Sequence, residues 1–199
     1  MRYGAEHKQR TRRRIVEAGA RRFRESGYRA AGVDQVMKDA GLTAGGFYAH
    51  FSSKEALLAE TLGLSLEEVR SQLLGGLEGL EGVEWLQAVV RRYLSRAHRD
   101  QPGAGCPLPT LGSEIAREGE EPRLALQSYL QQIVAELAPR TPAAPGLDPE
   151  DRVLATAALF AGALMLARAV PDEVLSDRIL RVARRLALPE TAEPHTLTP

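Results

Sequence analysis

Apolar residues along this chain recur every three or four positions, the spacing that places them on one face of an α-helix. This pattern predicts nine helices, at about residues 15–26, 33–40, 43–51, 54–74, 86–97, 107–117, 122–137, 150–170 and 172–186. No stretch alternates apolar and polar residues cleanly, and aromatic residues make up only 5% of the chain, so strands are not expected. The predicted fold class is therefore all-α.

Residues with strong turn or capping preferences mark the ends of several of these helices. Gly27 and Gly41 follow the first and second helices, where glycine readily adopts the left-handed conformation that ends a helix. Thr43 is placed to cap the third helix, and Ser52 or Ser53 to cap the fourth. These signals agree with the helix boundaries that the apolar pattern predicts.

The charges are unevenly distributed along the chain. The 199 residues contain 26 Lys or Arg and 26 Asp or Glu, and the resulting net charge of zero argues against a nucleic-acid partner. Residues 1–54, however, carry 12 basic and 5 acidic side chains, a balance of +7, and the remainder carries −7. A basic segment joined to an acidic one suggests two parts with different partners.

The composition also indicates a compartment. A single cysteine, Cys106, cannot form an internal disulfide and is typical of a reducing environment. No apolar stretch follows the basic N-terminus, so no signal peptide is expected. The longest apolar run, residues 153–170, is interrupted by polar residues and falls short of the roughly 20 residues that a membrane span needs. We therefore expect a cytoplasmic protein without a membrane partner.

The segment 33–54 carries the sharpest functional signal. A short helix, a turn at Gly41 and a second helix opening at Thr43 form the order of a helix-turn-helix. Gly45 and Gly46 fall in the first turn of the second helix, although each glycine costs about 1 kcal/mol relative to alanine. Because a helix without side chains at these positions can approach another surface closely, the pair favours insertion into a DNA major groove.

Aromatic and polar side chains follow the two glycines. Phe47 and Phe51 lie four residues apart on one helix face, so they are expected to anchor the helix to the core. Tyr48, His50 and Lys54 are hydrogen-bond donors, and they are expected along a rim where DNA phosphates run.

At these residues the chain resembles the TetR family of bacterial transcriptional regulators. The resemblance covers Ile15 to Leu58 and rests on Phe23, Gly27-Tyr28, Val33-Asp34-Gln35-Val36, the run from Ala40 to Phe51, and the run from Ser53 to Leu58. It implies an all-helical homodimer whose N-terminal domain binds a palindromic operator and whose C-terminal domain binds a small-molecule inducer. It also implies DNA contacts from the stretch that enters the groove and its flank: Thr43, Ala44, Gly45, Gly46, Phe47, Tyr48, His50 and Lys54.

One position departs from the family pattern. The family commonly has a hydroxyl pair where this chain has Ala31-Gly32, so a phosphate contact is lost, although Gly32 can still cap the second helix. The candidates to replace that contact are Arg29 and a basic arm that contains Lys8, Arg10, Arg12, Arg13 and Arg14. The same departure supports the alternative that the chain binds other partners rather than DNA.

Charge and helix order divide the chain at the same place. Residues 1–54 are the predicted DNA-binding helix-turn-helix domain, called the head below. Residues 55–188 are the predicted ligand-binding and dimerisation domain, called the body. Residues 189–199 are expected to be a disordered tail.

Two helices of the body are candidates for a dimer interface. The predicted helix at 150–170 is apolar nearly all round and rich in alanine and glycine, and the one at 172–186 is amphipathic. Two such helices from each of two chains would form a four-helix dimer interface. The alternative is a core buried within one monomer.

A ligand pocket is expected among the fifth to eighth helices. Aromatic or polarizable residues lie on or beside their inner faces, and the candidate lining groups are Trp85, Tyr93, Cys106, Leu111, Tyr129, Phe160 and Met165. Each of them is equally suited to ordinary core packing. No charged cluster selects a ligand class, so a mostly apolar inducer is expected.

Cys106 allows a sharper hypothesis, an electrophile- or redox-sensing regulator. It precedes a predicted helix, and a thiol at a helix N-terminus has a lowered pKa. The surrounding segment also resembles a TetR subgroup, some of whose members sense electrophiles or oxidants. The alternatives are a small buried hydrophobe and, remotely, a thiol-dependent helical enzyme that pairs Cys106 with His98.

Other chemistry has little support in the sequence. Nothing places an acid, a base and an anion site together. The histidines lie far apart, no Cys/His spacing suits zinc, and no glycine-rich phosphate loop follows a strand. No enzymatic activity, metal or cofactor is therefore expected.

Overall fold

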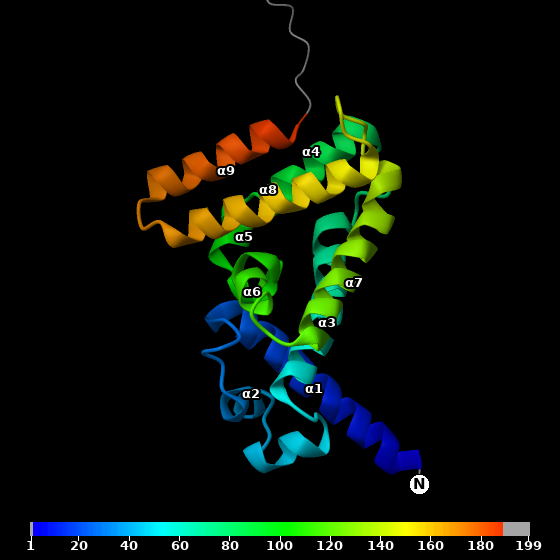
Figure 1. The fold of residues 1–199 in the computed structure, drawn as a ribbon, viewed down its shortest axis with the longest axis vertical. Coiled ribbons are helices and arrows are strands. Elements are labelled where there is room, and N and C mark those ends of the chain that lie inside the picture. Colours follow the sequence, from blue (N-terminus) through cyan, green and yellow to red (C-terminus); the bar gives the residue numbers. More distant parts are fainter. Residues whose placement is uncertain (1, 189–199) are drawn as a thin grey trace, which may run out of the picture.

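The computed structural model describes residues 2–188, and these residues form helices and no strand (Figure 1). In chain order the elements are α1 (Arg2–Ser26), α2 (Val33–Asp39), η1 (Ala44–Ala49), α3 (Lys54–Leu74), α4 (Gly82–Tyr93), α5 (Arg96–Asp100), η2 (Pro102–Ala104), α6 (Leu108–Ile115), α7 (Glu120–Leu137), η3 (Ala138–Arg140), α8 (Pro149–Ala169) and α9 (Glu173–Ala187), where η denotes a 3₁₀ helix. The predicted all-α fold is confirmed for this range. The expected tail at 189–199 lies outside the described residues.

Three of the predicted helices differ clearly from those in the structure. The first begins at Arg2, so the basic arm at residues 8–14 belongs to α1. The second half of the helix-turn-helix is the six-residue 3₁₀ helix η1, not an α-helix, and its paired glycines disfavour a longer regular helix. The fifth predicted helix is divided at Leu94, whose φ of −90° and ψ of 50° are not helical. Ser95 then caps α5, because its Oγ accepts a hydrogen bond from the His98 N–H at 3.1 Å.

The other predicted helix ends are mostly as expected. Gly27 and Gly41 have φ values of 83° and 68°, the left-handed conformation that favours glycine. Ser53 caps α3 by accepting a hydrogen bond from the Ala56 N–H at 3.0 Å. Thr43 occupies the N-cap position of η1, but its side chain makes no capping hydrogen bond, so the capping role expected of it is wrong.

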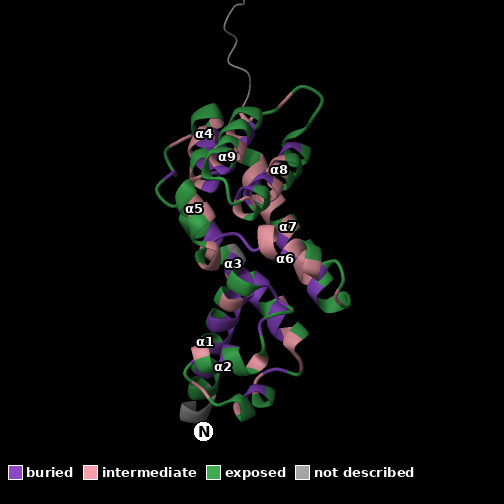
Figure 2. Ribbon diagram, turned by 90° about the vertical axis from the view of Figure 1, so that its left-hand side faces the viewer, coloured by how far each residue is buried: buried purple, intermediate pink, exposed green. Residues whose placement is uncertain are grey.

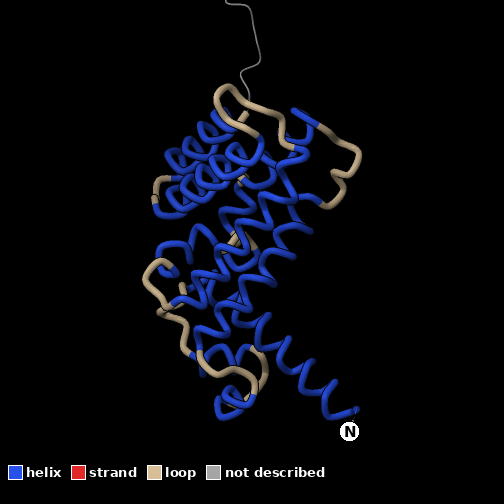
Figure 3. Tube along the Cα trace, turned by 45° about the vertical axis from the view of Figure 1, so that its right-hand side comes forward, coloured by secondary structure: helices blue, strands red, loops and turns tan. Residues whose placement is uncertain are grey.

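The helices build an elongated molecule with the head at one end (Figure 1). There α1 and α2 lie with η1, α3 and α7 run side by side through the middle, and α8 and α9 lie against each other at the far end. Short loops join most of these elements (Figure 3).

Buried apolar residues form one cluster in the head and another in the body (Figure 2). The body cluster surrounds Trp85 and Phe160. The head cluster holds Phe23 and Phe47, and it is completed by residues that follow position 54: Leu57, Leu58, Leu62, Leu111 and Ile115. The core of the head therefore depends on side chains from α3 and α6.

A buried arginine ties α1 to two other elements. Arg24 is 3% exposed and donates from Nε to the Gly103 carbonyl at 2.8 Å and from Nη1 to Ser65 Oγ at 2.6 Å. Its Nη2 pairs with Glu68 at 2.8 Å. Because all three guanidinium nitrogens have partners, the charge is tolerated at this depth. The end of α1 is thus held against α3 and η2.

The helix α8 is 21 residues long and apolar enough to cross a membrane by length and composition alone, so the expectation that this run falls short of a span is wrong. In the fold it packs against α7 and α9 and buries side chains such as Phe160 and Leu164. Packing within the helical body accounts for part of its apolar character, since 33% of its most apolar 18-residue window is buried.

Candidate functional site

The helix η1 presents a bare stretch of backbone to solvent. Gly45 is exposed, and a Cβ placed on it would have nothing within 4 Å. A Cβ on Gly46 would instead lie 3.6 Å from the methyl group of Met37 in α2, so Gly46 faces the core of the head. Of the two glycines, only Gly45 leaves the outer surface open, a distinction that the sequence pattern does not provide.

The side chains around the two glycines point in different directions. Thr43 and Ala44 are exposed, and Tyr48 is 74% exposed. Phe47 is fully buried, and its ring stacks on that of Phe51 at a centroid distance of 5.6 Å. The DNA contact expected of the Phe47 side chain is therefore wrong, since this ring anchors η1 to the head cluster.

His50 follows η1 and lies near cations of α1. Its side chain is partly buried, and its Nδ1 has no hydrogen-bond partner among residues 2–188. Burial and the nearby charges of Lys8 and Arg12 lower its pKa.

Lys54 is turned toward the protein. Its ammonium group donates to the Tyr28 carbonyl and lies 4.2 Å from the centroid of the Tyr28 ring. Burial lowers the pKa of Lys54, and the charges of Glu114 and Glu118 oppose that effect. A phosphate contact from Lys54 therefore requires its ammonium group to leave Tyr28.

The three consecutive arginines of α1 have different surroundings. Arg12 pairs with Glu60 of α3 and donates to the His50 carbonyl, and Arg14 donates at 2.6 Å to a carbonyl at the end of α2. The side chain of Arg13 is 76% exposed. Arg13 pairs with Glu17 at 2.9 Å, one turn along α1 itself. Arg12 and Arg14 bind other elements of the head, so Arg13 is the member of this run whose partner lies on its own helix and is itself exposed.

A carboxylate of α6 holds the turn that follows α1. Glu114 accepts hydrogen bonds from the backbone N–H groups of Tyr28 at 2.6 Å and Arg29 at 3.3 Å. The exposed Arg29 side chain lies 3.4 Å from the largely buried carboxylate of Glu118. Since Glu114 follows Tyr28 by 86 residues, no local sequence pattern could indicate this contact.

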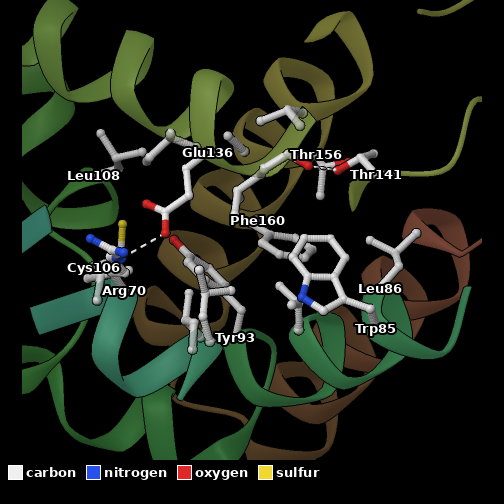
Figure 4. Close-up of a pocket in the computed structure, with 18 of the residues that line it drawn as sticks. Arg70, Trp85, Leu86, Tyr93, Cys106, Leu108, Glu136, Thr141, Thr156 and Phe160 are labelled. Carbon is white, nitrogen blue, oxygen red and sulfur yellow. Dashed lines mark hydrogen bonds and ion pairs between the residues drawn. The ribbon is translucent and has the colours of Figure 1, made fainter. Parts of the chain in front are cut away.

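The body contains a cavity of about 90 Å³ among α3, α4, α7 and α8 (Figure 4). Its lining is mostly apolar and includes five of the expected residues, Trp85, Tyr93, Cys106, Tyr129 and Phe160. The Tyr93 and Phe160 rings stack at a centroid distance of 4.6 Å. Arg70 and Glu136 form an ion pair at 2.7 Å at one side of the cavity.

Two expected pocket residues, Leu111 and Met165, do not line this cavity. The helix α6 runs from the cavity toward the head, so Leu108 lines the cavity while Leu111, one turn later, is buried in the head cluster. On α8, Met165 follows Phe160 by five residues, which turns it by roughly 140° about the helix axis. It is 46% exposed as a result. Both expectations are therefore wrong.

Cys106 is a buried thiol. Its side chain is 2% exposed, and burial raises its pKa despite a hydrogen bond with the Leu108 N–H, so the lowered pKa expected at this helix end is wrong. His98 accepts a hydrogen bond at Nε2 from the backbone N–H of Cys106 at 3.0 Å and donates from Nδ1 to the Tyr93 carbonyl at 2.7 Å. Both nitrogens of the imidazole thus bind backbone groups, and the ring does not activate the thiol.

An apolar strip lies on the outer side of the last two helices. Its exposed side chains are Leu154, Met165 and Leu166 from α8 and Val174, Leu175, Val182 and Leu186 from α9. Exposed apolar side chains gathered on two helices that pack against each other favour a protein–protein interface.

Known proteins share both the head sequence and the whole fold. The family model described as bacterial regulatory proteins, tetR family, matches residues 15–61. An HTH-type transcriptional regulator of Mycobacterium tuberculosis is 30% identical over 191 residues, which cover 92% of this chain and 96% of that protein.

Solved structures extend this similarity to three dimensions. A TetR transcriptional regulator from Chloroflexus aurantiacus has a TM-score of 0.72 and 26% identity, covering 92% of this chain and 94% of that one. AibR, in complex with isovaleryl coenzyme A and operator DNA, shares the fold with a TM-score of 0.63 at 18% identity, over 90% of this chain and 98% of its own. The chain described here belongs to the TetR family of DNA-binding transcriptional regulators.

Proposed function

We propose that this regulator is a repressor that binds a palindromic operator as a homodimer and is released by a small-molecule inducer. The observation that carries its mode of DNA binding is the outer face of η1, where Gly45 has nothing within 4 Å and Tyr48 is 74% exposed. A backbone this bare can approach base edges in the major groove, and neighbouring donors can hold phosphates. The proposed contacts are Arg29, Thr43, Ala44, Gly45, Tyr48, His50 and Lys54.

The proposed homodimer forms through the apolar strip on α8 and α9. The same strip on a second copy would bury it in a self-complementary, two-fold interface. A dimer of this kind presents two heads to one face of the DNA, about 34 Å apart or a multiple of that distance. Binding to chromosomal operators places the protein in the cytoplasm.

Ligand response is proposed to pass through α6. Leu108 lines the cavity, Leu111 lies in the head cluster, and Glu114 holds the turn at Tyr28. A ligand that displaces Leu108 would therefore move two contacts of the head at once. AibR, which has this fold, holds isovaleryl coenzyme A and operator DNA in one complex, and this supports a combination of ligand and DNA binding.

The DNA-binding proposal is tested by selecting bound duplexes from a random-sequence library with the full-length protein. We expect an enriched inverted repeat, bound by two chains, with an affinity that falls as salt rises because phosphate contacts release counterions. The Tyr48→Ala variant should bind both the selected and a scrambled duplex more weakly. Recovery of no preferred sequence would refute operator binding and favour a different partner.

A further inference from the structure

Two buried polar groups in the body cavity are poorly satisfied by the part of the chain that the structure describes: the first has no hydrogen-bond partner, and the second has only the weak contact of the Cys106 thiol. The indole Nε1 of Trp85 and the hydroxyl of Tyr93 belong to cavity-lining side chains that are 1% and 5% exposed. In Figure 4 both side chains extend from α4 toward the space that Phe160 borders. A buried group left unpaired or weakly paired is costly, so these two groups indicate a partner that occupies the cavity.

The chemistry of the two groups restricts that partner. An indole N–H can only donate, so the ligand atom opposite Trp85 must be an acceptor. The Tyr93 hydroxyl can supply a second donor. The remaining phenol, that of Tyr129, lies 3.6 Å from the Cys106 sulfur and already has a partner.

The rest of the lining favours a flat, apolar body. The rings of Trp85, Tyr93 and Phe160 border the cavity together with aliphatic side chains of α3, α7 and α8. Aromatic rings in such a site prefer to pack against another ring, stacked or edge-on. An aromatic ligand therefore makes more favourable contacts with this lining than an extended aliphatic chain does.

The charges at the cavity cancel. Arg70 and Glu136 are paired with each other at 2.7 Å, and they are the charged side chains among the described lining residues. An ionised ligand would lose its hydration without gaining a free counter-charge. The cavity therefore favours an uncharged ligand.

The size of the cavity limits the ligand and connects it to the head. Its volume is about 90 Å³, whereas an apolar cavity of about 150 Å³ takes up benzene. A single ring therefore fits only if the lining moves outward. Leu108 of α6 belongs to that lining, so the movement acts on the helix that holds the head.

We propose that the cavity binds an uncharged, single-ring aromatic molecule with an acceptor oxygen next to the ring, the class represented by aryl ketones. The acceptor faces the Trp85 N–H, and Tyr93 is an additional donor. This inference deepens the proposed ligand response and rests on it for the biological role, but the binding itself can be measured without DNA.

Three small probes of nearly equal shape test the proposal on the full chain by calorimetry. Acetophenone carries the acceptor, α-methylstyrene replaces its oxygen with a CH₂ group, and benzoate replaces its methyl group with a charged oxygen. We expect acetophenone to bind about tenfold more tightly than α-methylstyrene, and benzoate to bind more weakly than either. Because Trp85 is the single tryptophan in the chain, its fluorescence reports occupancy of the cavity independently.

Conservative variants show which side chain faces the acceptor oxygen of the ligand. Trp85→Phe keeps a ring but removes the N–H, and Tyr93→Phe removes only the hydroxyl. In Trp85→Phe, acetophenone should bind less tightly, whereas the affinity for α-methylstyrene should change little. The preference for acetophenone over α-methylstyrene should therefore fall from about tenfold to near unity. Tyr93→Phe should reduce the preference in the same direction. Tyr28→Phe loses the same hydroxyl in the head and should keep the full preference, and circular dichroism checks that each variant is folded.

The outcomes separate this proposal from the DNA-binding one. Absence of acetophenone binding, equal or tighter binding of α-methylstyrene or benzoate, or a full preference for acetophenone that survives in Trp85→Phe would overturn the proposal. None of these results affects operator binding, which is measured with the selected duplex. Conversely, failure to select a duplex would leave a measured preference for acetophenone standing.

Discussion

Glu114 of α6 accepts a hydrogen bond from the backbone N–H of Tyr28 at 2.6 Å, so a carboxylate of the body holds the turn between α1 and α2. The same short helix places Leu108 in the cavity and Leu111 in the head cluster. Cavity, head core and turn are thus connected through eight residues of α6. A displacement of α6 reaches the head at two separate contacts.

Removing the Glu114 carboxylate is expected to loosen the head. Glu114→Ala leaves the N–H groups of Tyr28 and Arg29 without their acceptor, and loss of such charge-assisted bonds costs about 1–3 kcal/mol in the free energy of unfolding. Urea denaturation measures this loss, and ligand-induced release from the operator should also weaken. Glu118→Ala, which removes only the weaker pairing with Arg29, is the control and should cost no more than about 1 kcal/mol. Equal losses in the two variants would contradict the role of Glu114.

Bulk at Gly45 is expected to abolish operator binding without affecting folding. Gly45 is exposed and a Cβ there meets nothing within 4 Å, so Gly45→Leu should leave the free energy of unfolding within about 0.5 kcal/mol of the parent chain. The added side chain would block close approach to the groove and lower operator affinity at least tenfold, measured by fluorescence anisotropy. Gly46→Leu presses instead on Met37 and should lower stability. An intact operator affinity in Gly45→Leu would exclude this docking of η1.

A charge in the apolar strip is expected to separate the dimer. Val182 lies in α9 and is 53% exposed in the single chain. Val182→Asp would bury a carboxylate without a partner in the proposed interface, so light scattering after gel filtration should report monomers, and operator affinity should fall. Gln132→Asp introduces the same charge at an exposed position of α7, outside the strip, and should remain dimeric. A dimeric Val182→Asp protein would place the interface elsewhere.

Stability is expected to fall in mild acid because of His98. Its neutral ring links the Tyr93 carbonyl to the Cys106 N–H, and burial lowers its pKa below the ordinary 6.5. The unfolded chain then binds a proton more readily than the folded one. Stability is full above pH 6.5 and is lost as the pH falls from there toward the lowered pKa.

Urea denaturation at a series of pH values between 7 and 5 measures this dependence. His98→Gln keeps a donor and an acceptor but cannot titrate, so its free energy of unfolding should change less over that range. His50, whose pKa is also lowered, accounts for part of the slope that remains. Parallel curves for the two proteins would show that His98 does not contribute.

The head could be predicted from the sequence because its signals are local. Gly27, Gly41 and Ser53 each act on the backbone within a few residues, and all three end or begin helices where the pattern places them. The outward direction of Gly45 and the inward direction of Gly46 could not be predicted, since they depend on how η1 packs against α2.

The body was less predictable because its contacts join distant segments. Apolar spacing identified Trp85 and Phe160 as inward-facing, and both line the cavity. It could not show that α6 leaves the cavity after Leu108 or that α8 turns Met165 outward. Glu114 had no local signal at all, because its partners are backbone groups at the other end of the molecule.

The shared core of the head limits how this regulator can be recombined with others. A chimera that joined residues 1–54 to a foreign body would separate Phe23 and Phe47 from four of the residues that complete their cluster, Leu57, Leu58, Leu111 and Ile115. The DNA specificity of the head can therefore be transferred to another regulator only if the matching surfaces of α3 and α6 are transferred with it. The smallest exchangeable unit thus combines two separate stretches of the chain, residues 1–62 and the helix α6.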